Sequence, residues 1–391
     1  MRQRNAAQTL GLLYRTGPTT MATLQRESGL SRRTLELILE DLIANGWVGE
    51  TASTPADARP VGRPARSFTF RYDAACIVAL QLEAGQIHAT VADLAATVLG
   101  DLRVPLPMST PRLERLALAE GAVARLLADA GLERSAVVAV TVSTPGIVHD
   151  DGTVDLPMTI REWTGFSLSE AVGELFDCPV RVENDAKLAA VGEKWSREGE
   201  VQDFVYIFAD SERIGLGLVL RNELYRGLDG AAGEVTWAPE LGLRDLKSTL
   251  LMGFDDPDAA GHDEAHALVA AARAGDADAL REVDALAREI APGITVIASL
   301  LAPEEVILGG SLGSVQDLLI PALSAVLDER ERPLATNIRG SQFGDQSVLT
   351  GCLRMCIESL ADQLFTASAT RGIGPSPAAL VQAGYGREDV G

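Results

Sequence analysis

Four consecutive polar residues, Ser31, Arg32, Arg33 and Thr34, precede a run of apolar residues that recur at helical spacing. An arginine guanidinium is suited to guanine edges and to phosphate oxygens. Side chains of these types at the N-terminal end of a helix are typical of a recognition helix in the major groove. The residues therefore predict contact with double-stranded DNA.

The charge of the chain is distributed as this interpretation requires. The 391 residues carry a formal net charge of −21. Residues 1–70 contain nine Arg, no Lys and six Asp or Glu, which gives +3, whereas the other 321 residues contain 25 basic and 49 acidic groups, which gives −24. DNA binding needs local positive charge rather than a positive total, so the acidity of the remainder does not exclude it.

The surrounding residues predict a winged helix-turn-helix. Apolar spacing predicts a helix over 4–15, a second from Thr20 to Ser28, a turn at Gly29, and a third helix that Ser31 caps. The stretches "GWVGE" and "SFTFRYD" predict the two strands of a wing. Further predicted DNA contacts, to phosphate or a minor groove, come from three arginines in and beside the wing: Arg59, Arg63 and Arg66. The alternative is a small helical module for dimerisation or protein docking.

The rest of the chain alternates between strand and helix patterns. Residues 76–94 predict two strands joined by a turn, and a long helix is expected over 111–131. Strands at "AVVAVTVSTPG" and "PVRVEND" flank a helix at 167–176, and further helices are expected within 262–301 and over 314–328. This is a mixed α/β pattern.

Several motifs, in order and at matching spacing, resemble the ROK family of repressors and sugar kinases. They are "GRPA", "VSTPGIV", "EWTGFSLSEAVGELFDCPVRVENDAKLAAVGE", "NELYRGLDGAAGEV" and "LLAPEEVILGGSLG". The resemblance implies an α/β fold in which a winged helix-turn-helix precedes a two-lobed actin-like (ribonuclease H-like) body. It also implies three domains. We place them at 1–70 for DNA binding, at 71–184 plus 356–391 for a first lobe with a returning C-terminal helix, and at 185–355 for a second lobe with ligand and oligomer contacts.

The phosphate-binding loops that the resemblance implies depart from the kinase pattern. The first loop is a DxGGT turn in the kinases. Here it is "LEAGQIH", in which Glu83 replaces the Asp and only Gly85 remains. The second loop, GTGxG in the kinases, corresponds to "DSERIG", residues 210–215, where two carboxylates would repel a triphosphate. Only "LGGSLG", residues 308–313, keeps a glycine-rich turn, which is also common for structural reasons. We therefore expect no kinase activity, no catalytic residue and no cofactor.

The sugar-binding residues of the family are only partly present. The resemblance maps its END and GEIGH motifs onto Asn184, Asp185 and Glu234, with Asp185 at the position of the kinase base and Trp237 in place of the family histidine. These four residues are the predicted ligand-binding set. Alternatively, the three that match remain as structural hydrogen-bonding groups. The family zinc motif CxCGxxGC has no counterpart in "WAPELGLRDLKSTLLMG", so we expect no metal site. His262 and His266 are four residues apart and are expected to be a solvated pair.

Composition and cysteine spacing agree with a reduced, water-soluble protein. The four cysteines are scattered without a CxxC pair, no uninterrupted apolar span could cross a bilayer, and no signal peptide is apparent. We therefore expect a cytoplasmic location and no membrane partner. Residues 372–391 are expected to be a loosely ordered tail.

Together these observations predict a transcriptional regulator, and among regulators they favour a repressor. Its predicted partners are an operator in double-stranded DNA, a sugar or sugar-derived effector, and further copies of the chain in a homodimer or homotetramer. Two alternatives stay open. One is an active ATP-dependent sugar kinase with an attached DNA-binding domain, and the other is a regulator whose body binds a protein and no small ligand.

Overall fold

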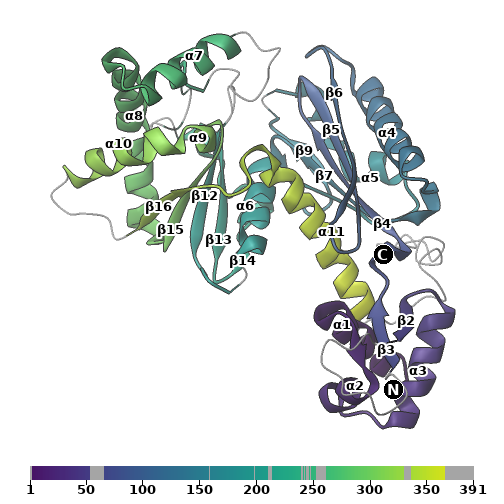
Figure 1. Ribbon diagram of the computed structural model, residues 1–391. Coiled ribbons are helices and arrows are strands. Elements are labelled where there is room, and N and C mark those ends of the chain that lie inside the picture. The colour runs from purple at the N-terminus through teal and green to yellow at the C-terminus, as the bar shows by residue number, and fades with distance from the viewer. Residues whose placement is uncertain are drawn as a thin grey trace.

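The computed structural model describes residues 2–52, 66–157, 159–197, 199–209, 214–238, 241, 243, 246, 248–251, 261–329 and 336–365. Figure 1 shows two α/β lobes side by side and a small helical head joined to one of them. The yellow helix α11 (Ser347–Phe365) runs from the space between the lobes to the head. This is the predicted arrangement of a winged helix-turn-helix followed by a two-lobed body.

The head has the predicted helix-turn-helix and wing. Its elements are α1 (Arg2–Thr16), β1 (Thr19–Thr20), α2 (Met21–Ser28), α3 (Arg32–Ala44), β2 (Val48–Ala52) and β3 (Arg66–Phe70). The strands form an antiparallel sheet in the order β1-β3-β2. Thr20 caps α2 through its side chain, and Gly29 ends this helix with φ of 68°, a left-handed conformation that glycine adopts without strain. Apolar residues of all three helices and of the wing share one buried core.

The first lobe is built on a five-stranded sheet in the order β11-β7-β4-β5-β6. Its strands are β4 (Cys76–Leu82), β5 (Gln86–Asp93), β6 (Val98–Pro105), β7 (Val137–Thr144) and β11 (Val180–Asn184). The lobe also has a small sheet of three strands: β8 (Ile147–Val148), β9 (Thr153–Asp155) and β10 (Phe166–Ser167). Its helices are α4 (Arg112–Asp129) and α5 (Leu168–Gly173), and its short turns are η1 (Tyr72–Ala74), η2 (Arg134–Ala136) and η3 (Arg161–Trp163). The strand β6, an exposed edge of the sheet, was absent from the sequence prediction because charged and apolar residues are mixed along it.

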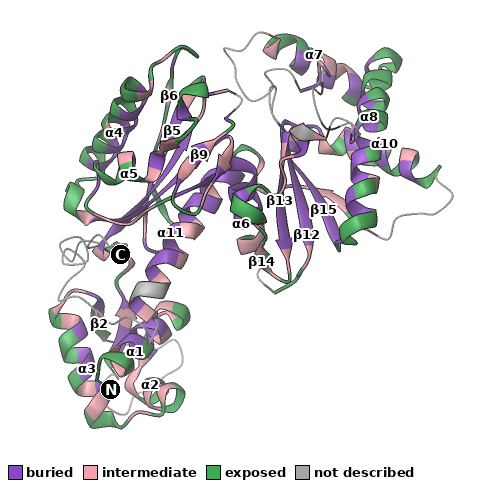
Figure 2. Ribbon diagram, turned by 180° about the vertical axis from the view of Figure 1, so that it is seen from behind, coloured by how far each residue is buried: buried purple, intermediate pink, exposed green. Residues whose placement is uncertain are grey.

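The second lobe has a five-stranded sheet in the order β14-β13-β12-β15-β16. Its strands are β12 (Phe204–Ala209), β13 (Ile214–Leu220), β14 (Glu223–Leu224), β15 (Glu305–Gly310) and β16 (Asn337–Gly340). Its helices are α7 (His262–Arg273), α8 (Ala277–Leu301), α9 (Ser311–Ser314) and α10 (Gln316–Asp328), with the short turns η4 (Leu228–Gly230), η5 (Val235–Trp237) and η7 (Gly344–Gln346). Figure 2 shows the central strands buried and the outer faces of α8 and α10 exposed. No helix among the described residues is long and apolar enough to cross a membrane.

The helix α6 (Asp185–Ser196) lies between the lobes and belongs to both. It follows β11 of the first lobe directly, and it packs on β13 of the second lobe, where a side chain at Gly217 would meet the Ala186 carbonyl oxygen at 2.4 Å. Near its other end, buried Glu193 accepts hydrogen bonds from Arg339 at 2.6 Å and from Ser341 at 2.9 Å. The helix is therefore fixed to the second lobe at both ends.

The helix α11 packs against α6 with almost no space between the backbones. A Cβ atom at Gly351 would lie 1.8 Å from the Leu188 carbonyl oxygen, and one at Gly192 would lie 2.5 Å from the Ser347 carbonyl oxygen. Only glycine permits this approach. The helix begins at Ser347, so its first turns precede the 356–391 segment that the sequence predicted for the returning helix, while residues 366–391 lie outside the described part of the chain.

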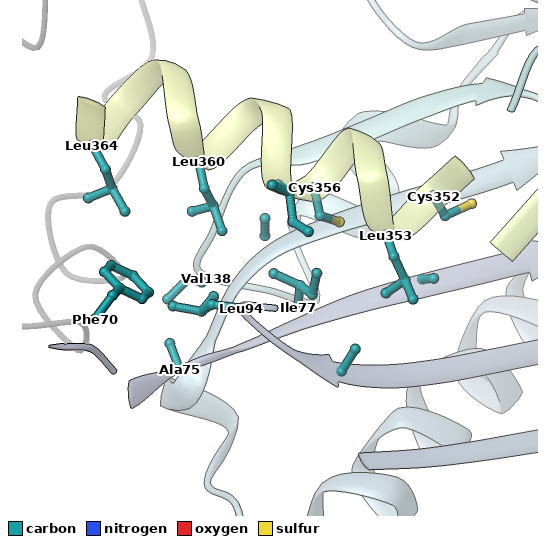
Figure 3. Packing of buried hydrophobic residues seen from close by; sticks show 14 of the residues in the cluster. Phe70, Ala75, Ile77, Leu94, Val138, Cys352, Leu353, Cys356, Leu360 and Leu364 are labelled. Atoms are coloured by element: carbon teal, nitrogen blue, oxygen red, sulfur yellow. The ribbon is translucent and has the colours of Figure 1, made fainter. Parts of the chain in front are cut away.

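The far end of α11 packs against the head. Cys352, Leu353, Cys356, Leu360 and Leu364 follow one face of the helix, and Figure 3 shows this row over the first-lobe sheet and then over Phe70 of the wing. The face is continuous, because the buried residues of the head, the first-lobe sheet and α6 form one apolar cluster with it.

Aromatic rings and hydrogen bonds complete the junction between head and body. The Phe365 ring centre lies 5.1 Å from that of Tyr14 and 6.5 Å from that of Phe70. The Tyr14 hydroxyl donates to the Leu94 carbonyl oxygen at 3.0 Å, and the Tyr72 hydroxyl donates to the Tyr14 carbonyl oxygen at 2.6 Å. Burial raises the pKa of Tyr14 to about 12, so this hydroxyl keeps its proton and its role as a donor.

We predict that Gly351→Ala destabilises the fold, because the new methyl group would clash with backbone that cannot move aside. The expected loss is about 1–3 kcal/mol of unfolding free energy, measured by urea denaturation. Gly121→Ala in α4 is the matched control, since no atom lies within 4 Å of its added Cβ and alanine favours a helix by up to about 1 kcal/mol. Equal stability of the two variants would contradict the close contact.

Candidate functional site

The predicted DNA-contacting residues of the helix-turn-helix lie together at the start of α3. The Ser31 side chain accepts from the Thr34 backbone N–H at 3.2 Å and caps the helix, which also brings the two hydroxyls within 2.8 Å. Arg32 pairs with Glu36 at 3.0 Å, whereas Arg33 is exposed at the surface of the helix. The arrangement presents a guanidinium and hydroxyls at the end of the helix where base contacts are made.

The wing contributes one described arginine to this surface. Arg66 opens β3 and pairs with Glu50 of β2 at 2.8 Å. Arg59 and Arg63 lie outside the described residues, so their predicted DNA contacts stay a prediction. The Arg32 and Arg66 side chains are 72% and 69% exposed, so water screens their ion pairs and phosphate can compete for each guanidinium.

Of the four predicted ligand-binding residues of the body, Asn184, Asp185 and Glu234 lie near the start of α6. Asn184 ends β11 and caps α6, with its Oδ1 accepting from the Lys187 backbone N–H at 3.2 Å and its Nδ2 donating to the Gly146 carbonyl oxygen at 3.0 Å. Asp185 is the first residue of the helix and is buried. The oxygen and the nitrogen of the Asn184 side-chain amide are thus both hydrogen-bonded. The residue has a structural role whether or not it also binds a ligand.

Glu234 approaches the same place from the second lobe. It directly precedes η5, and its carboxylate lies 3.7 Å from the Lys187 Nζ atom. Burial raises the pKa of Glu234 above its usual value, the Lys187 ammonium opposes this, and the nearby Asp185 carboxylate adds to the increase. Trp237 ends η5, but its side chain lies outside the described set.

Lys187 is a functional candidate that the sequence analysis missed. Its side chain is 1% exposed, and its Nζ atom has no hydrogen-bond acceptor among the described residues. The residue lies within the "VENDAKLAAVGE" motif, yet it matched none of the family residues to which a role was attached. Its one sequence signal was that a lysine occupies an otherwise apolar helix segment.

A second buried ion pair joins the two lobes beside this cluster. Arg226, just after β14, donates from Nε to the buried Glu183 carboxylate at 2.7 Å and from Nη2 to the Val148 carbonyl oxygen at 2.9 Å, and it also pairs with Asp150. The other Glu183 oxygen accepts from the Asn184 backbone N–H at 2.8 Å. Sequence reasoning missed this pair too, because nothing in the spacing brings residues 43 positions apart together.

The turn that corresponds to the first phosphate loop is closed by internal hydrogen bonds. Gln81 and Gln86 donate to the two carboxylate oxygens of Glu83 at 2.7 and 2.6 Å. Buried Arg115 of α4 donates to the Glu83 carbonyl oxygen and, at 3.0 Å, to that of Ala84. These bonds engage the Glu83 carboxylate and hold the turn through its carbonyl oxygens.

The glycine-rich turn at 308–313 has structural reasons for its glycines. A Cβ at Gly309 would lie 1.8 Å from the Tyr206 hydroxyl oxygen, and Gly310 has φ of 61°. Residues 210–213 of the second phosphate loop (210–215) lie outside the described residues. His262 and His266 stand on α7 with ring centres 4.3 Å apart, and no group of three potential ligands in the described part of the chain could hold a metal.

Comparison with known proteins agrees with this architecture. The model of the ROK family matches residues 77–238 and 257–359. The chain belongs to the ROK family. The xylose repressor of Caldicellulosiruptor bescii is 23% identical over 364 residues, which cover 85% of this chain and 90% of that protein. Among solved ROK structures, a ROK family transcriptional regulator, described as a homolog of the E. coli MLC protein, has a TM-score of 0.67 at 21% identity over 93% of this chain and 98% of its own.

ROK kinases share the body but not the whole chain. A ROK family glucokinase from Streptomyces griseus, solved in complex with glucose and AMPPNP, has a TM-score of 0.58 at 22% identity and covers 73% of this chain and 100% of its own. The predicted fold class is thereby confirmed. Family membership alone does not decide between a regulator and a kinase, because the family contains both.

We predict that Asn184→Ala lowers the unfolding free energy by about 1–2 kcal/mol even without ligand, because α6 loses its cap. Asn184→Asp is the matched control, since an aspartate can still accept from the Lys187 N–H while losing the bond to Gly146, and it should cost less. Urea denaturation measures both. Unchanged stability of Asn184→Ala would leave ligand binding as the only role for this side chain.

Proposed function

We propose that this chain is a DNA-binding transcriptional repressor whose head recognises an operator and whose body senses a sugar or sugar-derived ligand. The observation that carries the proposal is the exposed Arg33 at the start of α3 in a winged helix-turn-helix. The similar glucokinase covers only 73% of this chain. The name of the similar xylose repressor supports the same function.

The proposed DNA contacts divide by position. Ser31, Arg32, Arg33 and Thr34 lie where a recognition helix meets bases and the nearest phosphates. Arg66, together with Arg59 and Arg63 of the wing segment, is assigned to phosphates or the adjacent minor groove. A homodimer or homotetramer would place two such heads on a near-symmetric site, as paired half-sites require.

We propose further that the chain does not phosphorylate sugars. Asp185 occupies the position of the kinase base, but a base transfers nothing without a held phosphoryl donor. The Glu83 carboxylate is engaged by two glutamines, and Arg115 fixes the turn around it. Release of ADP above background with any sugar would contradict this part of the proposal.

The helix α11 is the proposed connection between ligand and DNA. Its N-terminal half packs on α6, which begins with Asp185 at the ligand-binding cluster, and its C-terminal end packs on the head through Phe365. A ligand that favours one arrangement of the two lobes would shift α6. Because the backbones of α6 and α11 are in contact, α11 would have to move with α6. A ligand acts in this way only by binding one conformation better than the other.

The decisive experiment is selection of genomic fragments by the full-length protein at near-physiological salt, followed by footprinting. We predict a discrete, near-symmetric site, and a loss of affinity for it in Arg33→Ala of about 5- to 150-fold, the effect of losing one base contact. Arg281→Ala, which removes an exposed arginine of the distant α8, is the control and should bind as the unchanged protein does. Binding spread over all sequences and lost steeply with salt would contradict the proposal.

Phe365→Ala tests the connection. We predict a loss of about 1–2 kcal/mol of stability, because the ring packs on the head and is partly exposed. Amide hydrogens of α1 should exchange faster, and an effector identified for the unchanged protein should alter operator affinity less. Leu300→Ala, at an exposed position of α8, is the control. A full effector response in Phe365→Ala would place the connection elsewhere.

A further inference from the structure

We infer that Lys187 is a ligand-binding residue and that it selects neutral ligands with two adjacent hydroxyl groups over sugar acids and sugar phosphates. The inference rests on the proposed function, since it concerns the ligand of the same cluster at the start of α6. It assigns a residue to which the family resemblance gives no role.

The first step is the position of the ammonium group. Lys187 is the third residue of α6, and its backbone N–H is held by the cap at Asn184, so the start of the side chain is fixed. The side chain is 1% exposed, and its Nζ atom lies 3.7 Å from Glu234 Oε1, which is too far for a hydrogen bond. Glu234 is 22% exposed, so the carboxylate faces the ammonium on one side and solvent on the other.

The second step is the unused hydrogen-bonding capacity. An ammonium group has three N–H donors, and no described residue offers Lys187 an acceptor within hydrogen-bonding distance. Buried donors without acceptors are costly and are rare in folded proteins. The neighbouring cation does not share this feature, because Arg226 already pairs with Glu183 and Asp150 and donates to Val148. Among the two cations of this cluster, Lys187 is therefore the one whose N–H donors lack acceptors in the described part of the chain.

The third step is the chemistry that fits. Lys187 can only donate hydrogen bonds, while the carboxylate forms of Asp185 and Glu234 can only accept them. A hydroxyl does both, so a pair of adjacent hydroxyls can donate to Glu234 and accept from Lys187 at once. A ligand carboxylate or phosphate can only accept, and it would meet two carboxylates against one ammonium. The donor and acceptor set thus favours a neutral polyhydroxylated ring.

A ligand that lacks one of these hydroxyls would leave the ammonium unpaired again. Sites built to bind a hydroxyl discriminate strongly against analogues without it, because their own buried groups then lose a partner. Lys187 therefore contributes specificity as well as affinity, and deoxy sugars should bind more weakly than their parents.

The test uses the full-length protein and a panel of neutral aldoses, their deoxy forms, the corresponding aldonic and uronic acids, and the 6-phosphates or 5-phosphates. Thermal stabilisation identifies binders, and calorimetry measures Kd. We expect a neutral aldose to bind and its acid and phosphate forms to bind at least about tenfold more weakly. Lys187→Met should weaken binding of the neutral aldose by at least about tenfold.

Two further variants make the result specific. Lys194→Met is the matched control, since Lys194 lies on the same helix in its last turn and its loss should leave Kd unchanged. Lys187→Gln keeps hydrogen-bond donors without the charge. Its Kd for the neutral aldose is expected to lie between those of the unchanged protein and Lys187→Met. This variant also serves if Lys187→Met fails to fold, a point settled by the melting temperature without ligand.

Three outcomes overturn the inference: equal Kd in Lys187→Met and Lys194→Met, preference for an acid or phosphate, or no binding by any neutral sugar. Operator selection with the same protein preparation distinguishes failure of the inference about Lys187 from failure of the proposed function. Operator binding without sugar binding removes the role of Lys187 and the proposed sugar sensing, and it keeps the DNA-binding repressor. Sugar binding that depends on Lys187, without a selected operator, removes the repressor and keeps the residue assignment.

Discussion

The contact between α6 and α11 is the interaction on which the rest of the structure depends. Gly192 and Gly351 allow the two helix backbones to touch, and any side chain there would overlap a carbonyl oxygen. Because packed helices at this distance cannot slide without a clash, the two behave as one unit. Through α6 this unit holds the start of the proposed ligand-binding cluster, and through Leu364 and Phe365 it holds the head. The buried face of α11 belongs to the apolar cluster that spans the head, the first lobe and α6.

Charge is placed around this unit in two distinct ways. At the far end of α6, Glu193 is fully satisfied by Arg339 and Ser341, and Glu305 pairs with both Arg339 and Arg197, so this network fixes the helix to the second lobe. At the near end, Lys187 and Glu234 form a looser pair with unmet hydrogen-bonding capacity. A satisfied network stabilises one arrangement, whereas a partly satisfied one is a place where a ligand can contribute energy. One end of α6 thus anchors the helix to the second lobe, and the other end is the proposed ligand sensor.

The relation to the ROK kinases is best seen at the turn that would hold phosphate. The body keeps the kinase architecture and an aspartate at the position of the base, yet Glu83 is surrounded by side-chain amides and Arg115. The contacts that hold α6 to α11 and to the second lobe involve other residues than this turn. Under the proposed function, a ligand favours one relation between the lobes, and the head carries that change to DNA.

The sequence by itself determined the features that arise from neighbouring residues. Helical spacing, the caps Thr20 and Ser31, and Gly29 placed the helix-turn-helix, and motif order indicated the two-lobed body. Only the tertiary structure decided the contacts between distant segments. It brought Lys187 to Glu234, Arg226 to Glu183 and Phe365 to Tyr14, and it revealed the engaged state of Asn184. The physical reason is that caps and periodicity act within a few residues, while burial of a charge or a ring depends on which remote surfaces pack against it.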